Sequence, residues 1–141
     1  MPTSRASAVW EGKLKDGKGN FRAASGAFSG PYTFATRFEG KQGTNPEELI
    51  AAAHAACFSM ALSAGLEKAG KPATRVETTA ACTMEMVDGT PTITKMELRV
   101  RGTVPGLDPA AFEKAAEEAK RGCPVSRALA GIPQITLDAK L

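Results

Sequence analysis

The chain has 141 residues, with 18 lysines and arginines against 15 aspartates and glutamates, so its formal net charge is +3. This length predicts a single domain over residues 1–141, and the scattered basic residues argue against a nucleic-acid partner. Three cysteines cannot all pair, which argues against a secreted disulfide scaffold. No apolar leader precedes the first expected strand, so we expect a cytoplasmic protein.

The first third of the chain has the pattern of β-strands. Residues 6–14 and 19–24 flank the turn signal Asp16-Gly17. Residues 32–38 alternate, with aromatic and threonine side chains on one face, which predicts another strand. In that strand Arg37 points away from the aromatic face, just before a glycine-rich loop.

A long helix is predicted from Pro46 to about Ala69. Asn45 suits the N-cap, Pro46 suits the first helical position, and Glu48 completes a variant of the capping box. The segment is long enough for a membrane span, but its alanine-rich composition with interspersed polar residues favours a buried helix of a soluble protein. Apolar residues lie on all its sides, and a small domain has difficulty covering such a helix alone, so we expect a partner chain.

The remaining segments alternate between strands and helices. The expected order is two strands, an amphipathic helix that opens at Asp108-Pro109, a short helix and a last strand, at residues 76–87, 92–101, 109–122, 124–129 and 134–138. Antiparallel hairpins with separate helices describe an α+β domain.

Cys57, in the middle of the long helix, is the first candidate for chemistry. Burial in an alanine-rich helix raises the pKa of a thiol, so a reactive Cys57 needs a positive partner. His54, the only histidine, shares its helix face, and Arg37 has a planar fork that suits a thiolate. The alternatives are a histidine bonded to backbone or solvent and a solvated strand arginine.

A second thiol, Cys123, lies between Gly122 and Pro124 at the start of the short helix. Free N–H groups there favour a thiolate, although a simple capping role is the alternative. Cys82 lies on the apolar face of a strand, where core packing is expected. There is no Cys-x-x-Cys, and one histidine with dispersed cysteines argues against a metal site.

Glu47 is informative through its distance from Cys57. The two residues are ten positions apart in one helix, about 15 Å at 1.5 Å per residue. If Glu47 serves the thiol site, it does so across a twofold axis, from an antiparallel copy of the helix that crosses near Ala52. The alternative is that Glu47 only complements the N-terminus of its own helix.

These residues resemble the OsmC branch of the OsmC/Ohr family. The resemblance runs from Trp10-Glu11-Gly12 to the last strand, and its most specific segments are Asn45-Pro46-Glu47-Glu48-Leu49 and Cys123-Pro124-Val125-Ser126. The position of Arg37 in the chain is typical of the OsmC branch. The resemblance implies an OsmC-like fold, with antiparallel sheets wrapped around two central helices in an intertwined homodimer.

The resemblance also implies an activity and a set of roles. The activity is reduction of organic hydroperoxides, and less well of hydrogen peroxide, in oxidative or osmotic stress defence, by cysteines alone and without a cofactor. Cys57 matches the peroxidatic cysteine and Cys123 the resolving one, and an external dithiol regenerates them. Arg37 matches the arginine that supports the thiolate, and Glu47 the glutamate that orients it. The alternative is a redox sensor or a carrier of small hydrophobic ligands that uses the same pocket without turnover.

Overall fold

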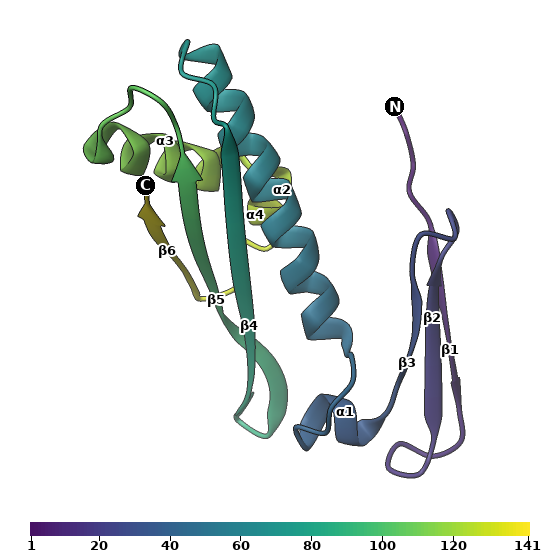
Figure 1. Ribbon diagram of the computed structural model, residues 1–141. Helices are drawn as coiled ribbons and strands as arrows, with labels where there is room; N and C mark the ends of the chain where they lie inside the picture. Colours follow the sequence, from purple (N-terminus) through teal and green to yellow (C-terminus); the bar gives the residue numbers. More distant parts are fainter. The chain divides into compact units, whose positions relative to one another are not determined.

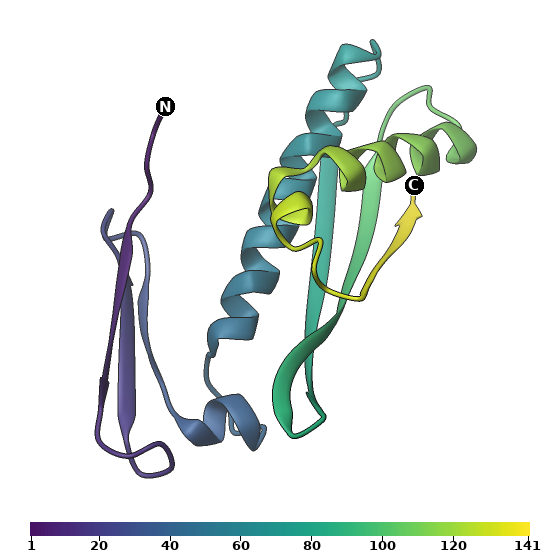
Figure 2. The same ribbon diagram turned by 180° about the vertical axis from the view of Figure 1, so that it is seen from behind.

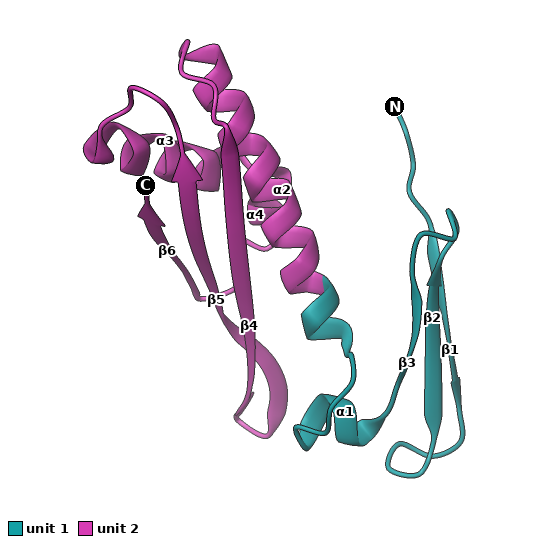
Figure 3. Ribbon diagram, in the orientation of Figure 1, with its two compact units in different colours: residues 1–49 teal, residues 50–141 magenta.

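The computed structural model describes residues 1–141, and the chain forms two compact units within it. Unit 1 comprises Met1–Leu49 and unit 2 comprises Ile50–Leu141, coloured separately in Figure 3. The expectation of a single domain therefore stays a prediction.

Unit 1 is built on a small antiparallel sheet. Its strands are β1 (Ala6–Glu11), β2 (Lys18–Ala23) and β3 (Ser29–Tyr32), in the spatial order β1-β2-β3. The rings of Trp10 and Tyr32 lie 5.5 Å apart between centroids. Aromatic packing therefore stabilises one face of this sheet.

The predicted strand at residues 32–38 is wrong. β3 ends at Tyr32, and residues Phe34–Phe38 form a short helix, α1. The reason is a reciprocal cap: the Thr36 N–H donates to Thr33 Oγ1 and the Thr33 N–H donates to Thr36 Oγ1. These bonds satisfy backbone donors that a strand would have paired with a neighbour, and the local helix replaces the alternating pattern.

The long helix is confirmed as α2 (Pro46–Lys68). The Glu48 N–H donates to Asn45 Oδ1 at 2.8 Å, as expected of an N-cap. Although α2 is long and apolar enough to cross a membrane, it is a core helix: Phe58, Leu62 and Leu66 are buried in the core of unit 2. Unit 2 covers that side of α2 and leaves Met60 76% exposed.

Unit 2 places a second three-stranded sheet beside the helices (Figures 1 and 2). The hairpin of β4 (Arg75–Val87) and β5 (Thr90–Thr103) is antiparallel, with a register shift between Thr83 and Met84. β6 (Gln134–Lys140) pairs with β5 in parallel, not in the antiparallel sense expected for both sheets. The reason is the crossover formed by α3 (Pro109–Gly122) and α4 (Pro124–Ala128). It carries the chain from the end of β5 back toward the beginning of β5, so that β6 runs in the same direction.

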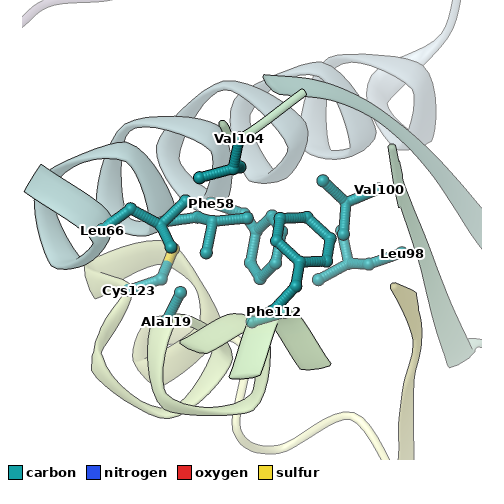
Figure 4. Close-up of a cluster of buried hydrophobic side chains, with 10 residues drawn as sticks. Phe58, Leu66, Leu98, Val100, Val104, Phe112, Ala119 and Cys123 are labelled. Atoms are coloured by element: carbon teal, nitrogen blue, oxygen red, sulfur yellow. The ribbon is translucent and has the colours of Figure 1, made fainter. Parts of the chain in front are cut away.

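The core of unit 2 joins α2, β5 and α3. Phe58, Val100, Phe112 and Cys123 are completely buried in one cluster (Figure 4). The Phe112 ring packs so closely on Gly102 that a Cβ there would lie 2.5 Å from a ring carbon. This core fixes α2 and the α3–α4 junction relative to the sheet. Each of them carries a candidate cysteine, Cys57 on α2 and Cys123 at the junction.

Candidate active site

The structure brings Cys57 and Cys123 into direct contact. Their Sγ atoms lie 3.0 Å apart, although the residues are 66 positions apart in the chain. Cys57 is half-buried on α2, and Cys123 is buried where α3 ends and α4 begins. The Cys123 N–H donates to the Ala119 carbonyl at 2.8 Å, and Pro124 starts the next helix. The core therefore holds the two thiols where they can share a proton or form a bond.

The surroundings of the two thiols favour opposite charge states. Burial raises the pKa of Cys57, and the adjacent Cys123 adds to this effect. Burial acts on Cys123 in the same direction, but interactions with Cys57, with the Ser126 amide and hydroxyl and with the Val125 amide outweigh it and lower the pKa of Cys123. Within unit 2 the surroundings therefore favour the charged form of Cys123 over that of Cys57.

Arg37 and Glu47 form an ion pair within unit 1. Arg37 Nη2 lies 2.8 Å from Glu47 Oε1, and Arg37 Nε donates to both carboxylate oxygens at 3.1 and 3.3 Å. Glu47 is buried and Arg37 is more accessible, with its guanidinium 5.3 Å from the Phe38 ring centre. Arg37 thus does not point away from the aromatic residues, because α1 replaces the expected strand. The carboxylate fixes one edge of the guanidinium and leaves the remaining N–H donors for a ligand.

His54 has a partner that the sequence did not indicate. It is fully buried, and its Nε2 lies 2.6 Å from the hydroxyl oxygen of Ser126, 72 positions later in the chain. The expectation of a histidine bonded to backbone or solvent is therefore wrong. Burial lowers the pKa of His54, so the ring is neutral at physiological pH. No sequence pattern points to Ser126 as the partner, because the two residues lie so far apart in the chain.

An apolar groove of about 480 Å³ runs between α2 and α3 in unit 2. Ala61 and Gly122, near Cys57 and Cys123 in the chain, line it, and its charged lining residues are Lys71, Lys114 and Glu118. Cys82 is half-buried on β4 opposite Met96 of β5, as expected of a packing residue.

Known proteins resemble this chain along nearly its whole length. The family model described as OsmC-like protein matches residues 38–138. The chain is 50% identical over 138 residues to Peroxiredoxin OsmC of Escherichia coli (strain K12), which covers 97% of this chain and 95% of that protein. The chain belongs to the OsmC family.

Other OsmC-family matches are more distant. An Organic hydroperoxide resistance protein of Xanthomonas axonopodis pv. citri (strain 306) is 36% identical over 100 residues, covering 70% of this chain and 68% of that protein. The crystal structure of an organic hydroperoxide resistance protein OsmC from Legionella pneumophila has a TM-score of 0.79 at 22% identity, covering 100% of this chain and 98% of that chain. The chain therefore has an α+β OsmC-like fold with two three-stranded sheets and a long helix.

Proposed function

We propose that this chain is a thiol-dependent peroxidase that reduces organic hydroperoxides and, less well, hydrogen peroxide, in the oxidative and osmotic stress defence of the cytoplasm. The observation that carries the proposal is the 3.0 Å contact between Cys57 and Cys123, in a chain 50% identical to a peroxiredoxin. The apolar groove is lined by Ala61, one helical turn after Cys57, and by Gly122, which precedes Cys123, and it suits the organic part of a hydroperoxide.

The proposed first step takes place at Cys57. Its thiolate attacks the terminal peroxide oxygen, an S–O bond forms, the O–O bond breaks, and the alkoxide leaves as an alcohol after taking up a proton. Cys57 becomes a sulfenic acid and the peroxide gains two electrons. Arg37, oriented by Glu47, supplies the charge that Cys57 lacks within unit 2 and stabilises the negative charge on the departing oxygen.

The proposed second step takes place at Cys123. Its thiolate attacks the Cys57 sulfur, the S–S bond forms, and the sulfenic hydroxyl leaves as water after protonation. An external dithiol then reduces the disulfide by two thiol–disulfide exchanges and carries away the oxidising equivalents. No cofactor or metal is needed in this cycle.

We also propose that the active form is an intertwined homodimer, in which each chain is a single domain. Two observations support it: unit 2 leaves one side of α2 uncovered, with Met60 and the neighbouring small residues exposed, and Glu47 lies ten positions before Cys57 on the same helix. In such a dimer, Arg37 and Glu47 of one chain serve the thiols of the other.

The peroxidase differs from a redox sensor or a hydrophobic carrier in its turnover. We expect the chain to consume many equivalents of an alkyl hydroperoxide when a dithiol is in excess, because the disulfide returns to two thiols after each cycle. The measurement is peroxide consumption per subunit over time. Oxidation that stops after one equivalent, followed by changed binding to another protein, contradicts the enzyme and supports the sensor.

A shared site predicts complementation between two inactive variants. Glu47→Ala alone should lower activity by about tenfold to a hundredfold, because Arg37 loses the carboxylate that orients it. Refolding Glu47→Ala together with Cys57→Ser at equal amounts should restore about a quarter of wild-type activity, since half of the dimers are mixed and each has one complete site.

The matched control for this mixture is Glu48→Ala, which removes an exposed carboxylate from the same helical turn and should leave activity unchanged. A mixture no more active than its parents contradicts the shared site and places all four groups in one chain. If sedimentation shows a monomer and that monomer is fully active, the dimer proposal is wrong as well.

A further inference from the structure

The buried pair of His54 and Ser126 has no part in the cycle described above. His54 Nε2 and Ser126 Oγ are 2.6 Å apart, both residues are buried, and Nδ1 of the same ring has no hydrogen-bond partner. Ser126 lies in the first turn of α4, three positions after the N-cap Cys123, and its hydroxyl is one of the groups that lower the pKa of the Cys123 thiol. His54 on α2 and Cys123 at the start of α4 thus have Ser126 as a common neighbour.

We propose that His54 is a positioning residue, which acts through Ser126 to direct the serine hydroxyl at the Cys123 sulfur. This inference deepens the proposed function and rests on it for the role of Cys123 in the second step. It assigns a task to the only histidine in the chain.

The tautomer of His54 follows from its contacts. A neutral imidazole carries one proton, and a buried N–H without an acceptor is less tolerable than a buried lone pair without a donor. Since Nδ1 has no partner, the proton belongs on Nε2, which donates it to Ser126 Oγ. The serine hydroxyl then keeps its own proton for another acceptor, and in the proposed arrangement this acceptor is the Cys123 sulfur. With the proton on Nδ1, the serine would donate to His54 instead and turn away from the thiol.

The consequence for the second step is a more stable Cys123 thiolate. When Cys57 is a sulfenic acid, the attacking group is the Cys123 thiolate, and a hydrogen bond to the charged form favours it. The titratable group that faces the Cys123 sulfur is Cys57, and His54 faces Ser126. None of the ion pairs of unit 2 includes any of these four residues. The orientation of one hydroxyl therefore has a measurable effect on the charge of Cys123.

The test is a pH titration of Cys123 without peroxide. In a Cys57→Ser, Cys82→Ala background Cys123 is the only thiol, and the chemical shift of its isotope-labelled Cβ reports its ionisation by NMR. We expect Ser126→Ala to raise the pKa of Cys123 by about one unit, the value for one hydrogen bond to a charged group. His54→Leu should raise it by less, because the freed hydroxyl samples other directions. His54→Gln should stay near wild type, since its amide N–H can replace Nε2.

Two further measurements separate positioning from a merely structural role. The nitrogen chemical shifts of the single histidine should show the Nε2–H tautomer, and an Nδ1–H tautomer overturns the proposal. In the presence of Ser126→Ala, His54→Leu should cause no further shift in the pKa of Cys123, because His54 acts through the hydroxyl. The proposal is also overturned if His54→Leu shifts the pKa of Cys123 equally with and without Ser126. It is overturned as well if Ser126→Ala and His54→Leu both fold and neither changes that pKa.

The rate of the second step completes the test. After one equivalent of an alkyl hydroperoxide, rapid quenching and mass spectrometry follow conversion of sulfenic acid to disulfide in the otherwise wild-type chain. Ser126→Ala should slow this step about threefold: a one-unit rise in pKa lowers the thiolate fraction tenfold, and the greater nucleophilicity of the thiolate recovers about threefold.

An unchanged rate despite a raised pKa of Cys123 contradicts the role of Ser126 in the second step. If no sulfenic acid forms at all, the proposed peroxidase fails, while the titration still decides the role of His54. If His54→Leu does not fold, the wild-type tautomer, Ser126→Ala and His54→Gln decide it.

Discussion

Cys57→Ser is expected to abolish peroxide turnover, with a loss of at least about a thousandfold, or about 4 kcal/mol of transition-state stabilisation. The serine hydroxyl stays protonated at neutral pH and cannot hold oxygen as a sulfenic acid does. Cys123 remains in place, but it is completely buried, so it does not replace the missing nucleophile. The measurement is the consumption of an alkyl hydroperoxide with a dithiol in excess.

Cys82→Ala is the matched control for Cys57→Ser. It removes a thiol of similar exposure from β4, at a position paired with Met96, and should leave turnover within about twofold of wild type. If Cys57→Ser keeps full turnover, or if Cys82→Ala loses it, the assignment of the first step to Cys57 is wrong.

Cys123→Ser is expected to separate the first step from turnover. One equivalent of peroxide should still be reduced, and turnover with a dithiol should then fall by about a hundredfold, because no second thiol lies within reach of the Cys57 sulfur. The sulfenic acid persists and is open to oxidation to the sulfinic acid, which a dithiol does not reverse. Mass spectrometry after one equivalent should show a Cys57–Cys123 disulfide in the wild type and a mono-oxygenated Cys57 in the variant.

The wild-type product tests the cysteine pairing independently of rates. A wild-type chain that accumulates sulfenic acid without the Cys57–Cys123 disulfide contradicts the proposed second step. Equal turnover of wild type and Cys123→Ser assigns resolution to the external dithiol instead.

The elements predicted best are those whose signals are local and long. α2 begins at Pro46 as expected, because Asn45 and Pro46 are start signals that need no tertiary context. The short segment after Tyr32 was mistaken for a strand, because five residues give too little periodicity to compete with a cap. The reciprocal bonds of Thr33 and Thr36 decide its structure.

Among the contacts between distant residues, some could be expected from the sequence and others could not. The pairing of Arg37 with Glu47 was expected only from the family resemblance, and the structure contains it. The bond between His54 and Ser126 joins residues 72 positions apart, and neither residue type has a pattern that predicts such a partner. The parallel pairing of β6 with β5 was missed for a related reason. Strand periodicity fixes which face is buried, but it does not fix direction, which depends on the crossover helices.

That parallel pairing also bears on how the protein is made. Cys57 leaves the ribosome early, whereas α3 and α4, with Cys123, are held at both ends only once β6 has been synthesised and has paired with β5. Contacts between distant segments form late, because the chain between them must be ordered first. During synthesis the nascent chain therefore carries its first thiol without its second. If an oxidant converts Cys57 to a sulfenic acid in that interval, Cys123 is not yet in place to trap it as a disulfide, and further oxidation can follow.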